Sequence, residues 1–256
     1  MNNRILGVRI DDIYAKGTEF YLKKFLNSKN FNMITPVNPI MLMISRKNPN
    51  FRKVLNSSEL NTCDGNGISM MFKMASRSIK RCPGSTLVYD VLDFSDKNHK
   101  KVFFLGAKPE VNKKARENIK KLHPKLKVMG YSPSYEKKAE GRFFDEEEKR
   151  ILSYIKKFKP QVICAFLGAP FQETWFYNNH KELQKLGVKI GLSLGRTADF
   201  IAGYSKRAPL SWQNMHLEWL YRLFAEKGRL KKVFPTLPLF VLFSLKDLLF
   251  HKVYKD

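Results

Sequence analysis

Short apolar runs alternate with helix-like segments along most of this chain, and this alternation limits the folds open to it. The strand-like runs are residues 4–10, 101–107, 126–132, 160–168 and 188–195. Amphipathic segments such as 109–123 and 145–158 separate several of them and have the spacing of surface helices. Because the strand-like runs are apolar throughout, both faces of the sheet should be covered. The pattern predicts an α/β fold with a mostly parallel sheet and helices on both faces.

Acidic and glycine residues directly follow several of the expected strands. Asp64 comes after the run ELNTC, and Gly106, Gly168 and Gly195 end three other runs. The carboxyl ends of parallel strands share one edge of a sheet, and ligands of such folds bind beyond that edge. We therefore expect these four residues to border a binding site.

The stretch TCDGNGIS places Asp64 on a turn between a strand and a helix. Glycines on both sides of Asn66 let the backbone turn sharply and approach a ligand. A carboxylate at such a turn suits a catalytic base, but it also suits an N-cap of the following helix. Both interpretations remain open from this stretch alone.

A second strand-to-helix turn, FLGAPFQETW, places Gln172 and Glu173 in the first turn of a helix. The free N–H groups at a helix start bind anions, and an acidic side chain there can also cap the helix. Ligand binding and capping are equally compatible with this turn.

Cationic side chains recur in the last quarter of the chain. Arg207 lies in the stretch SKRAP, which predicts an ordered loop, and is a candidate phosphate contact. Arg222, Arg229 and Lys232 share one helical face if a helix continues past Gly228. Such a face is either solvated or binds a diphosphate, since guanidinium groups grip phosphate oxygens in pairs.

The chain is strongly basic, with 47 Lys and Arg against 23 Asp and Glu and a net charge of +24. Such a charge attracts nucleic acids, anionic lipids or phosphorylated substrates. The lysines are spread through nearly every segment and no nucleic-acid-reading motif occurs, which argues against nucleic acid as a partner. Three cysteines without paired spacing indicate a reducing compartment, and neither a metal-ligand motif nor a nucleotide-binding glycine loop is present.

The character of the chain changes near residue 204. Residues 1–203 carry the α/β pattern, whereas 204–256 predict a helical, basic appendage. Within it Ser244, Asp247, His251 and Lys255 recur at helical spacing, with leucines elsewhere around the helix. The aromatic residues Phe240, Phe243 and Phe250 predict an apolar face in contact with an anionic membrane surface, and packing on the protein's own core is the alternative.

Five stretches in the same order resemble one family. They are DGNGIS, FFLGAKPEV, LGAPFQETW, DFIAG followed by RAP, and LEWLYRL followed by Arg229. Over roughly residues 4–233 the chain resembles the bacterial WecG/TagA/CpsF glycosyltransferases, glycosyltransferase family 26. The resemblance implies a Rossmann-like domain with a C-terminal appendage. It also implies metal-independent, inverting transfer of a sugar from a UDP-sugar to a polyprenyl-diphosphate-linked sugar in teichoic acid or cell-surface polysaccharide synthesis.

The resemblance also implies roles for single residues. Asp64 matches the general base, and Arg81 matches an arginine of the substrate pocket. The remaining substrate-binding matches are Thr35, Asn38, Gln172, Arg222, Arg229 and Lys232. The UDP-sugar is then a substrate, no cofactor is needed, and negative charge on the leaving UDP is stabilised by cations.

The implied enzyme works in the cytoplasm, held peripherally on the inner face of the membrane by its C-terminal segment. N-acetylmannosamine or a related hexose is the expected sugar, and a homo-oligomer remains open. Two alternatives remain: a non-catalytic membrane-surface adaptor of the same fold, and a basic nucleic-acid-binding protein.

Overall fold

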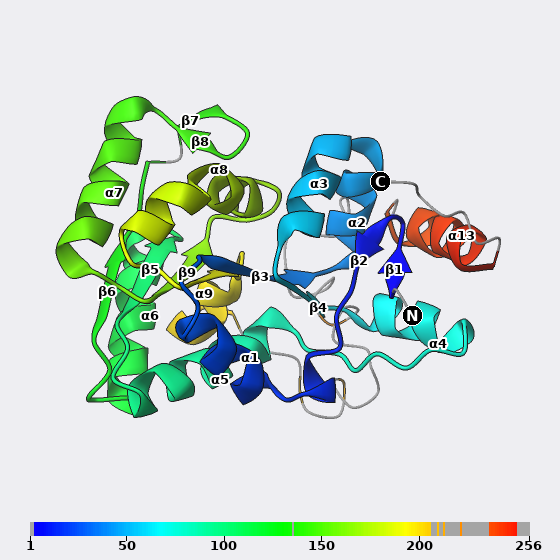
Figure 1. The fold of residues 1–256 in the computed structure, drawn as a ribbon, viewed down its shortest axis with the longest axis horizontal. Coiled ribbons are helices and arrows are strands. Elements are labelled where there is room, and N and C mark those ends of the chain that lie inside the picture. Colours follow the sequence, from blue (N-terminus) through cyan, green and yellow to red (C-terminus); the bar gives the residue numbers. More distant parts are fainter. Residues whose placement is uncertain are drawn as a thin grey trace.

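A computed structural model describes residues 3–134, 136–205, 209, 212, 221 and 236–249 of the protein. Its centre is a six-stranded parallel sheet in the order β4–β3–β10–β9–β5–β6 (Figure 1). The strands are β3 (Asn32–Val37), β4 (Leu60–Cys63), β5 (Val102–Gly106), β6 (Val128–Tyr131), β9 (Val162–Phe166) and β10 (Ile190–Ser193). The predicted parallel α/β architecture is confirmed.

Helices cover both faces of this sheet. One face carries α2 (Pro39–Lys47), α3 (Pro49–Ser57), α4 (Asn66–Met74), α7 (Asp145–Phe158) and α8 (Phe171–Lys185). The other carries α1 (Thr18–Leu26), α5 (Gly84–Lys97), α6 (Pro109–Leu122) and α9 (Thr197–Ala202). A short 3-10 helix, η1 (Ile13–Ala15), precedes α1, and a small hairpin of β7 (Lys137–Ala139) and β8 (Arg142–Phe143) precedes α7.

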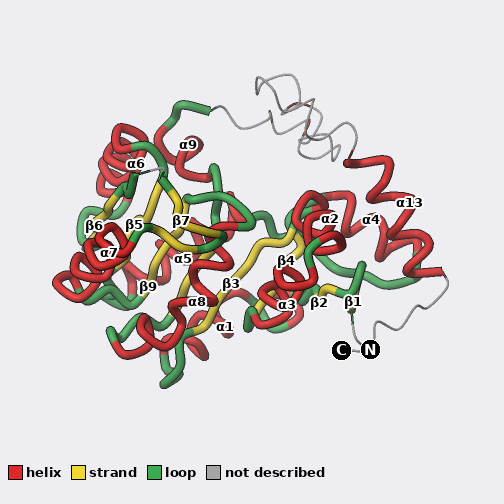
Figure 2. The backbone as a smooth tube through the Cα atoms, turned by 90° about the horizontal axis from the view of Figure 1, so that it is seen from above, coloured by secondary structure: helices red, strands yellow, loops and turns green. Residues whose placement is uncertain are grey.

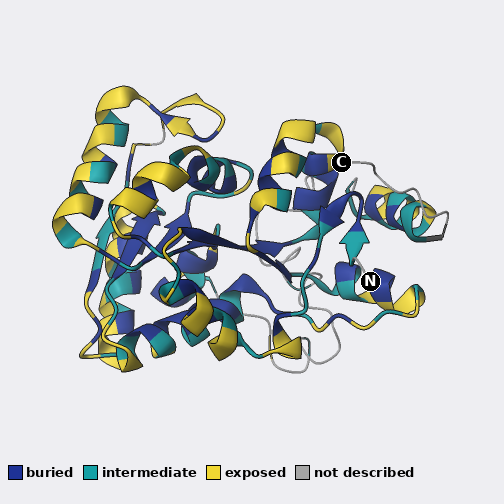
Figure 3. Ribbon diagram, viewed as in Figure 1, coloured by how far each residue is buried: buried dark blue, intermediate teal, exposed yellow. Residues whose placement is uncertain are grey.

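Strand β5 shows why the strands are apolar at every position. Phe103 and Leu105 pack into the core on one face of the sheet, and Val102 and Phe104 pack into the core on the other. Alternate side chains of a strand point to opposite faces, so a sheet covered on both sides needs apolar residues at each position. The central strands are accordingly buried along their length (Figure 3).

The first expected strand, residues 4–10, does not join the main sheet. It folds on itself as an antiparallel hairpin of β1 (Arg4–Ile5) and β2 (Val8–Arg9). The two residues between these strands, Leu6 and Gly7, both have positive φ, as a two-residue hairpin turn requires. The prediction of one continuous strand here is wrong because this turn reverses the chain within it.

The last described helix, α13 (Thr236–Leu249), packs beside α2 and α4 and touches β1 (Figures 1 and 2). Phe240 is fully buried, and its ring lies 3.3 Å from where a Cβ on Gly67 of α4 would stand. The ring of Phe243 stacks on Arg46 of α2, with the guanidinium carbon 3.6 Å from the ring centroid. The prediction that Phe240 faces a membrane is therefore wrong, because this ring fills the contact between α13 and α4.

The polar stripe of α13 also lies differently from what its spacing indicated. Ser244 is buried, and the carboxylate of Asp247 accepts a hydrogen bond from the backbone N–H of Leu6 at 2.6 Å. The exposed positions are instead Pro238, Leu239, Leu242 and Lys246, and the two leucines are 43% and 60% exposed. No helix in the described part of the chain is both long and apolar enough to cross a membrane. The predicted division at residues 203 and 204 stays a prediction.

Candidate functional site

The turn that carries Asp64 is built where strands β3 and β4 end side by side. The backbone N–H of Asp64 donates to the carbonyl of Val37, the last residue of β3, at 2.8 Å. Gly65 has a φ of 145°, and a Cβ there would lie 3.1 Å from Pro39, so this position needs glycine. The turn is thereby pressed against the start of α2, which fixes the half-buried carboxylate at the carboxyl edge of the sheet.

The N-cap position of α4 belongs to Gly65. Asp64 therefore lies one position before the cap, at the carboxyl edge of the sheet. The capping role and the role of a catalytic base both stay predictions.

Arg81 lies in the same neighbourhood as Asp64. The backbone N–H of Cys82 donates to the carbonyl of Cys63 at 2.8 Å, and the hydroxyl of Thr62 donates to the carbonyl of Cys82 at 3.0 Å. These bonds attach the segment of Arg81 to the end of β4. Burial raises the pKa of the Cys63 thiol to about 12, and the charges of Asp64 and Arg81 act on it in opposite directions. The structure thus brings together the predicted base and the predicted pocket arginine.

Thr35 and Asn38 lie at the end of β3, next to this turn. The hydroxyl of Thr35 is fully buried and lies 2.8 Å from the hydroxyl of Ser58. The side-chain oxygen of Asn38 caps α2 by accepting from the N–H of Met41 at 3.1 Å. Both oxygens therefore have partners in the fold, and substrate binding by either residue stays a prediction. The amide nitrogen of Asn38 has no partner within the described ranges and is the freer group of the two.

Gln172 lies near the middle of the same sheet edge, in the first turn of α8, beside the loops after β9 and β10. Its side-chain oxygen accepts three backbone N–H groups: Leu167 at 3.3 Å, Gly168 at 3.1 Å and Gly195 at 3.0 Å. Its amide nitrogen donates to Glu173 at 2.8 Å. Most of its hydrogen-bonding capacity is therefore used within the protein, and direct substrate contact remains a prediction.

Glu173 lies in the first turn of α8, as the sequence predicts, but it is fully buried, which sequence reasoning missed. Its own backbone N–H donates to its carboxylate, and a ligand role for it stays a prediction. Burial raises the pKa of its carboxyl to about 7. The one signal in the sequence is its position among the aromatic residues of PFQETWF, which is unusual for an exposed acid.

The remaining predicted cations cannot be placed in the site. Arg207, Arg222, Arg229 and Lys232 lie outside the described residues. Within the described ranges, no group of three or more His, Cys, Asp or Glu side chains is arranged to hold a metal ion. The use of cations instead of a metal therefore stays a prediction.

A hollow of about 670 Å³ runs along α4, beginning two residues after Asp64. Its described wall includes Asn66, Ser69, Met70, Lys73 and Arg77, with two more serines and an isoleucine after the helix. No acidic residue is among these wall residues. The hollow therefore combines hydroxyl, cationic and apolar groups, and sequence reasoning missed it because it arises from how α4 sits on the fold.

The model of the glycosyl transferase WecG/TagA/CpsF family matches residues 3–254 of the chain. The chain belongs to this family. The match spans both the sheet-edge turns and the C-terminal segment, so the resemblance inferred from five short motifs extends over nearly the whole sequence.

Curated members of the family include close matches in length. An N-acetylglucosaminyldiphosphoundecaprenol N-acetyl-beta-D-mannosaminyltransferase of Bacillus subtilis strain 168 is 31% identical over 230 residues, which cover 89% of this chain and 84% of that protein. The enzyme of the same name from Bacillus spizizenii strain W23 is 30% identical, with 87% and 82% covered. The one from Staphylococcus aureus strain MRSA252 is 25% identical, with 93% and 89% covered. Glycosyl transfer is the activity that the family name carries.

Proposed function

We propose that this glycosyltransferase moves a sugar, N-acetylmannosamine being the first candidate, from a UDP-sugar to N-acetylglucosamine on a polyprenyl diphosphate. The family match over residues 3–254 is the observation that carries the proposal. The relatives' names describe an N-acetylmannosaminyl transfer to such a lipid-linked sugar. The product would enter teichoic acid or another cell-surface polymer.

The reaction inverts the anomeric centre in this proposal. The names of the relatives specify a β-linked product. A UDP-sugar with the α configuration gives a β product when the acceptor hydroxyl attacks from the face opposite the leaving group. One displacement of this kind needs a base for the acceptor hydroxyl and stabilisation of the departing diphosphate.

Asp64 is the base that the geometry favours. It is half-buried and lies at the carboxyl edge of the sheet, one residue before the N-cap of α4. A carboxylate in this position takes the proton of the acceptor hydroxyl as the new bond forms, an effect worth about 10²–10⁴-fold in rate. We assign to Arg81, whose segment is tied to the end of β4, the role of holding a phosphate or a sugar oxygen.

The departing UDP carries increasing negative charge. We assign its stabilisation to arginines, with Arg222 and Arg229 as the predicted residues, because guanidinium groups bind diphosphate oxygens in pairs. The reaction then needs no metal. Turnover that persists in a chelator would support this assignment, and turnover that stops until Mg²⁺ is restored would contradict it.

The hollow along α4 is where we place the diphosphate of the acceptor. Lys73 and Arg77 supply positive charge in its wall, and the hollow begins beside the turn of the base. Met70 in its wall and Met74, one turn further along α4, are 53% and 58% exposed. An acceptor whose sugar lies at Asp64 would thus extend its diphosphate along the cations and its lipid over apolar side chains.

The protein would meet this lipid at the cytoplasmic membrane surface. Helices α4 and α13 pack together, and their exposed residues include the two methionines, Leu239 and Leu242, with Lys73 and Lys246. Apolar side chains beside lysines are typical of surfaces that bind anionic membranes. This membrane contact uses a different face of α13 from the one that the sequence indicated.

The test is UDP release from a panel of UDP-sugars by the purified protein in detergent, with and without a polyprenyl-diphosphate-N-acetylglucosamine acceptor. We expect release from one donor that depends on the acceptor, and a β linkage in the product by nuclear magnetic resonance. An α-linked product would contradict inversion. If UDP binds but no donor is turned over with this acceptor, the non-catalytic adaptor replaces the proposal.

A further inference from the structure

Two loops at the carboxyl edge of the sheet are tied together by one side chain. Leu167 and Gly168 begin the loop after β9, and Gly195 lies in the loop after β10. Their backbone N–H groups all converge on the side-chain oxygen of Gln172. The two strands are neighbours in the sheet, so this oxygen sets the spacing of their loops.

The carboxyl group of Glu173 fixes the side chain of Gln172. Its Oε1 accepts the side-chain N–H of Gln172 at 2.8 Å, which fixes the orientation of the amide. Because the amide oxygen must face the three backbone N–H groups, the amide nitrogen must face Glu173. The tie between the loops therefore depends on a second, fully buried side chain.

The surroundings of Glu173 favour its neutral form. Its Oε2 and the hydroxyl oxygen of Ser193, the last residue of β10, are both buried and have no partner at hydrogen-bond geometry within the described chain. The Ser193 hydroxyl is nevertheless close enough to lower the pKa of this carboxyl, while burial is the larger influence and raises it to about 7. A proton on Oε2 would let it donate toward the serine oxygen. An ionised carboxylate would be a buried charge without a counter-ion, which is costly.

We infer that Glu173 in its neutral form is a positioning residue, which with Gln172 holds the loop after β9 against the loop after β10. Ionisation strengthens the single bond from the Gln172 amide, but it leaves a buried charge without a counter-ion, so openings of the two loops that bring water to Glu173 become easier. The loops border the edge where the proposed donor binds, so only the effect on turnover rests on the proposed function. The tie itself does not.

No charged side chain of the described residues influences the pKa of Glu173. The influences are its burial, the Gln172 amide, its own backbone N–H and the Ser193 hydroxyl. A comparable group on a packed element is Glu148 of α7, which accepts from the indole N–H of Trp175 at 2.7 Å and whose pKa is also raised by burial. Glu148 makes no bond to either loop. It is therefore the matched control.

The direct test is amide hydrogen exchange of Leu167, Gly168 and Gly195 between pH 6 and pH 8.5. Protection factors are corrected for intrinsic exchange and referred to Phe104 in the middle of β5. We expect protection of the three amides to fall about tenfold across this range in the wild type, as the buried carboxyl ionises. The Glu173→Gln variant should keep its protection, because glutamine is neutral at every pH and of the same shape.

Several outcomes would overturn the inference, and none of them needs a substrate. Protection of the three amides that stays constant with pH in the wild type would overturn it, even if Glu173→Gln does not fold. An equal fall of protection with pH in Glu173→Gln would also overturn it. If the fall in protection with pH disappears in Glu148→Gln but persists in Glu173→Gln, the effect belongs to Glu148 instead.

A second readout separates positioning from a purely structural role. If the loops border the donor site, kcat/KM of the wild type falls above pH 7, and that of Glu173→Gln does not. A structural role alone would change the melting temperature and leave the shape of the pH profile unaltered. A chain that transfers no sugar would refute the proposed function and leave the exchange experiment to decide the tie.

Discussion

The two ends of the site use their polar residues in opposite ways. At the end formed by β3 and β4, Asp64 and Arg81 are half-buried and stand at the sheet edge. At the end formed by β9 and β10, Gln172 is 3% exposed and Glu173 is fully buried, and both bond mainly to the protein. A polar residue in a family motif can therefore serve a site by fixing its loops rather than by touching the substrate.

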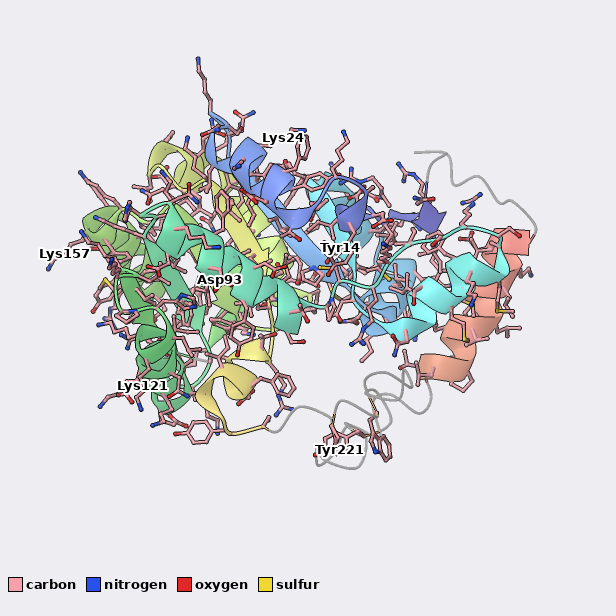
Figure 4. All side chains as sticks on the ribbon, turned by 90° about the horizontal axis from the view of Figure 1, so that it is seen from below. Tyr14, Lys24, Asp93, Lys121, Lys157 and Tyr221 are labelled. Carbon is pink, nitrogen blue, oxygen red and sulfur yellow. The ribbon has the colours of Figure 1, made fainter. Side chains whose placement is uncertain are left out.

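The positive charges of the molecule are spread over its surface and do not by themselves mark the site. Lys24 on α1, Lys121 on α6 and Lys157 on α7 point outward on different sides of the protein (Figure 4). These lysines form no single stripe. The residues that matter for the proposed chemistry are set apart by their place on the sheet edge, not by their charge alone.

The largest expected effect on stability is its pH dependence at the buried end. The folded state holds a proton on Glu173 up to a pKa of about 7, whereas the unfolded chain releases it near 4.5. Stability from this group is thus fully present below pH 4.5 and is lost as pH rises to about 7, by roughly 3 kcal/mol. Urea unfolding of the wild type and Glu173→Gln at pH 5 and pH 8 measures the difference. Parallel pH curves for the two proteins would contradict the buried neutral carboxyl.

Removing the shared acceptor should impair turnover more than folding. In Gln172→Ala three backbone N–H groups lose their partner, and we expect kcat/KM to fall about 100-fold because the loops shift. The expected loss of unfolding free energy is about 1–3 kcal/mol. Gln184→Ala is the control, since Gln184 lies on the same helix and accepts one N–H, from Phe31, away from these loops. Equal losses of activity in both variants would remove the distinction between the two ends.

The outward face of α13 and α4 gives a third test, at the membrane. Replacing Leu239 and Leu242 with serine should lower binding to anionic vesicles about 30-fold, since each half-exposed leucine contributes about 1 kcal/mol on burial. Leu122→Ser on α6 is the control, because Leu122 is similarly exposed on another element. Unchanged co-sedimentation of the double variant with anionic vesicles would contradict membrane contact through this face.

The smallest expected effect is on the acceptor. Lys73→Gln should raise the KM for the lipid acceptor about fivefold and leave the affinity for UDP unchanged, because it removes one cation from an open hollow. Lys80→Gln is the control, an exposed lysine nearby that does not line the hollow. If the affinity for UDP falls instead, Lys73 binds the donor rather than the acceptor.

Much of this architecture follows from local pattern. Apolar strands between amphipathic helices predict a parallel sheet, and the turn at Asp64 was found from its glycines alone. Other features depend on tertiary contacts that no pattern carries. The inward face of α13 is set by the pairing of Asp247 with Leu6, over 200 residues apart, and the burial of Glu173 is set by its aromatic neighbours and β10. The hairpin at residues 4–9 was missed because Leu6, rather than a second glycine, takes a positive φ.

The measurement that tests the central claim most directly is the turnover of Asp64→Asn beside its affinity for UDP. Asparagine keeps the shape of the side chain and cannot accept the proton, so we predict a loss of about 10²–10⁴-fold in acceptor-dependent UDP release. UDP affinity and the melting temperature should stay within about twofold and a few degrees of the wild type. A folded Asp64→Asn variant that turns over at the wild-type rate would contradict the assignment of the catalytic base to the β3–β4 end of the site.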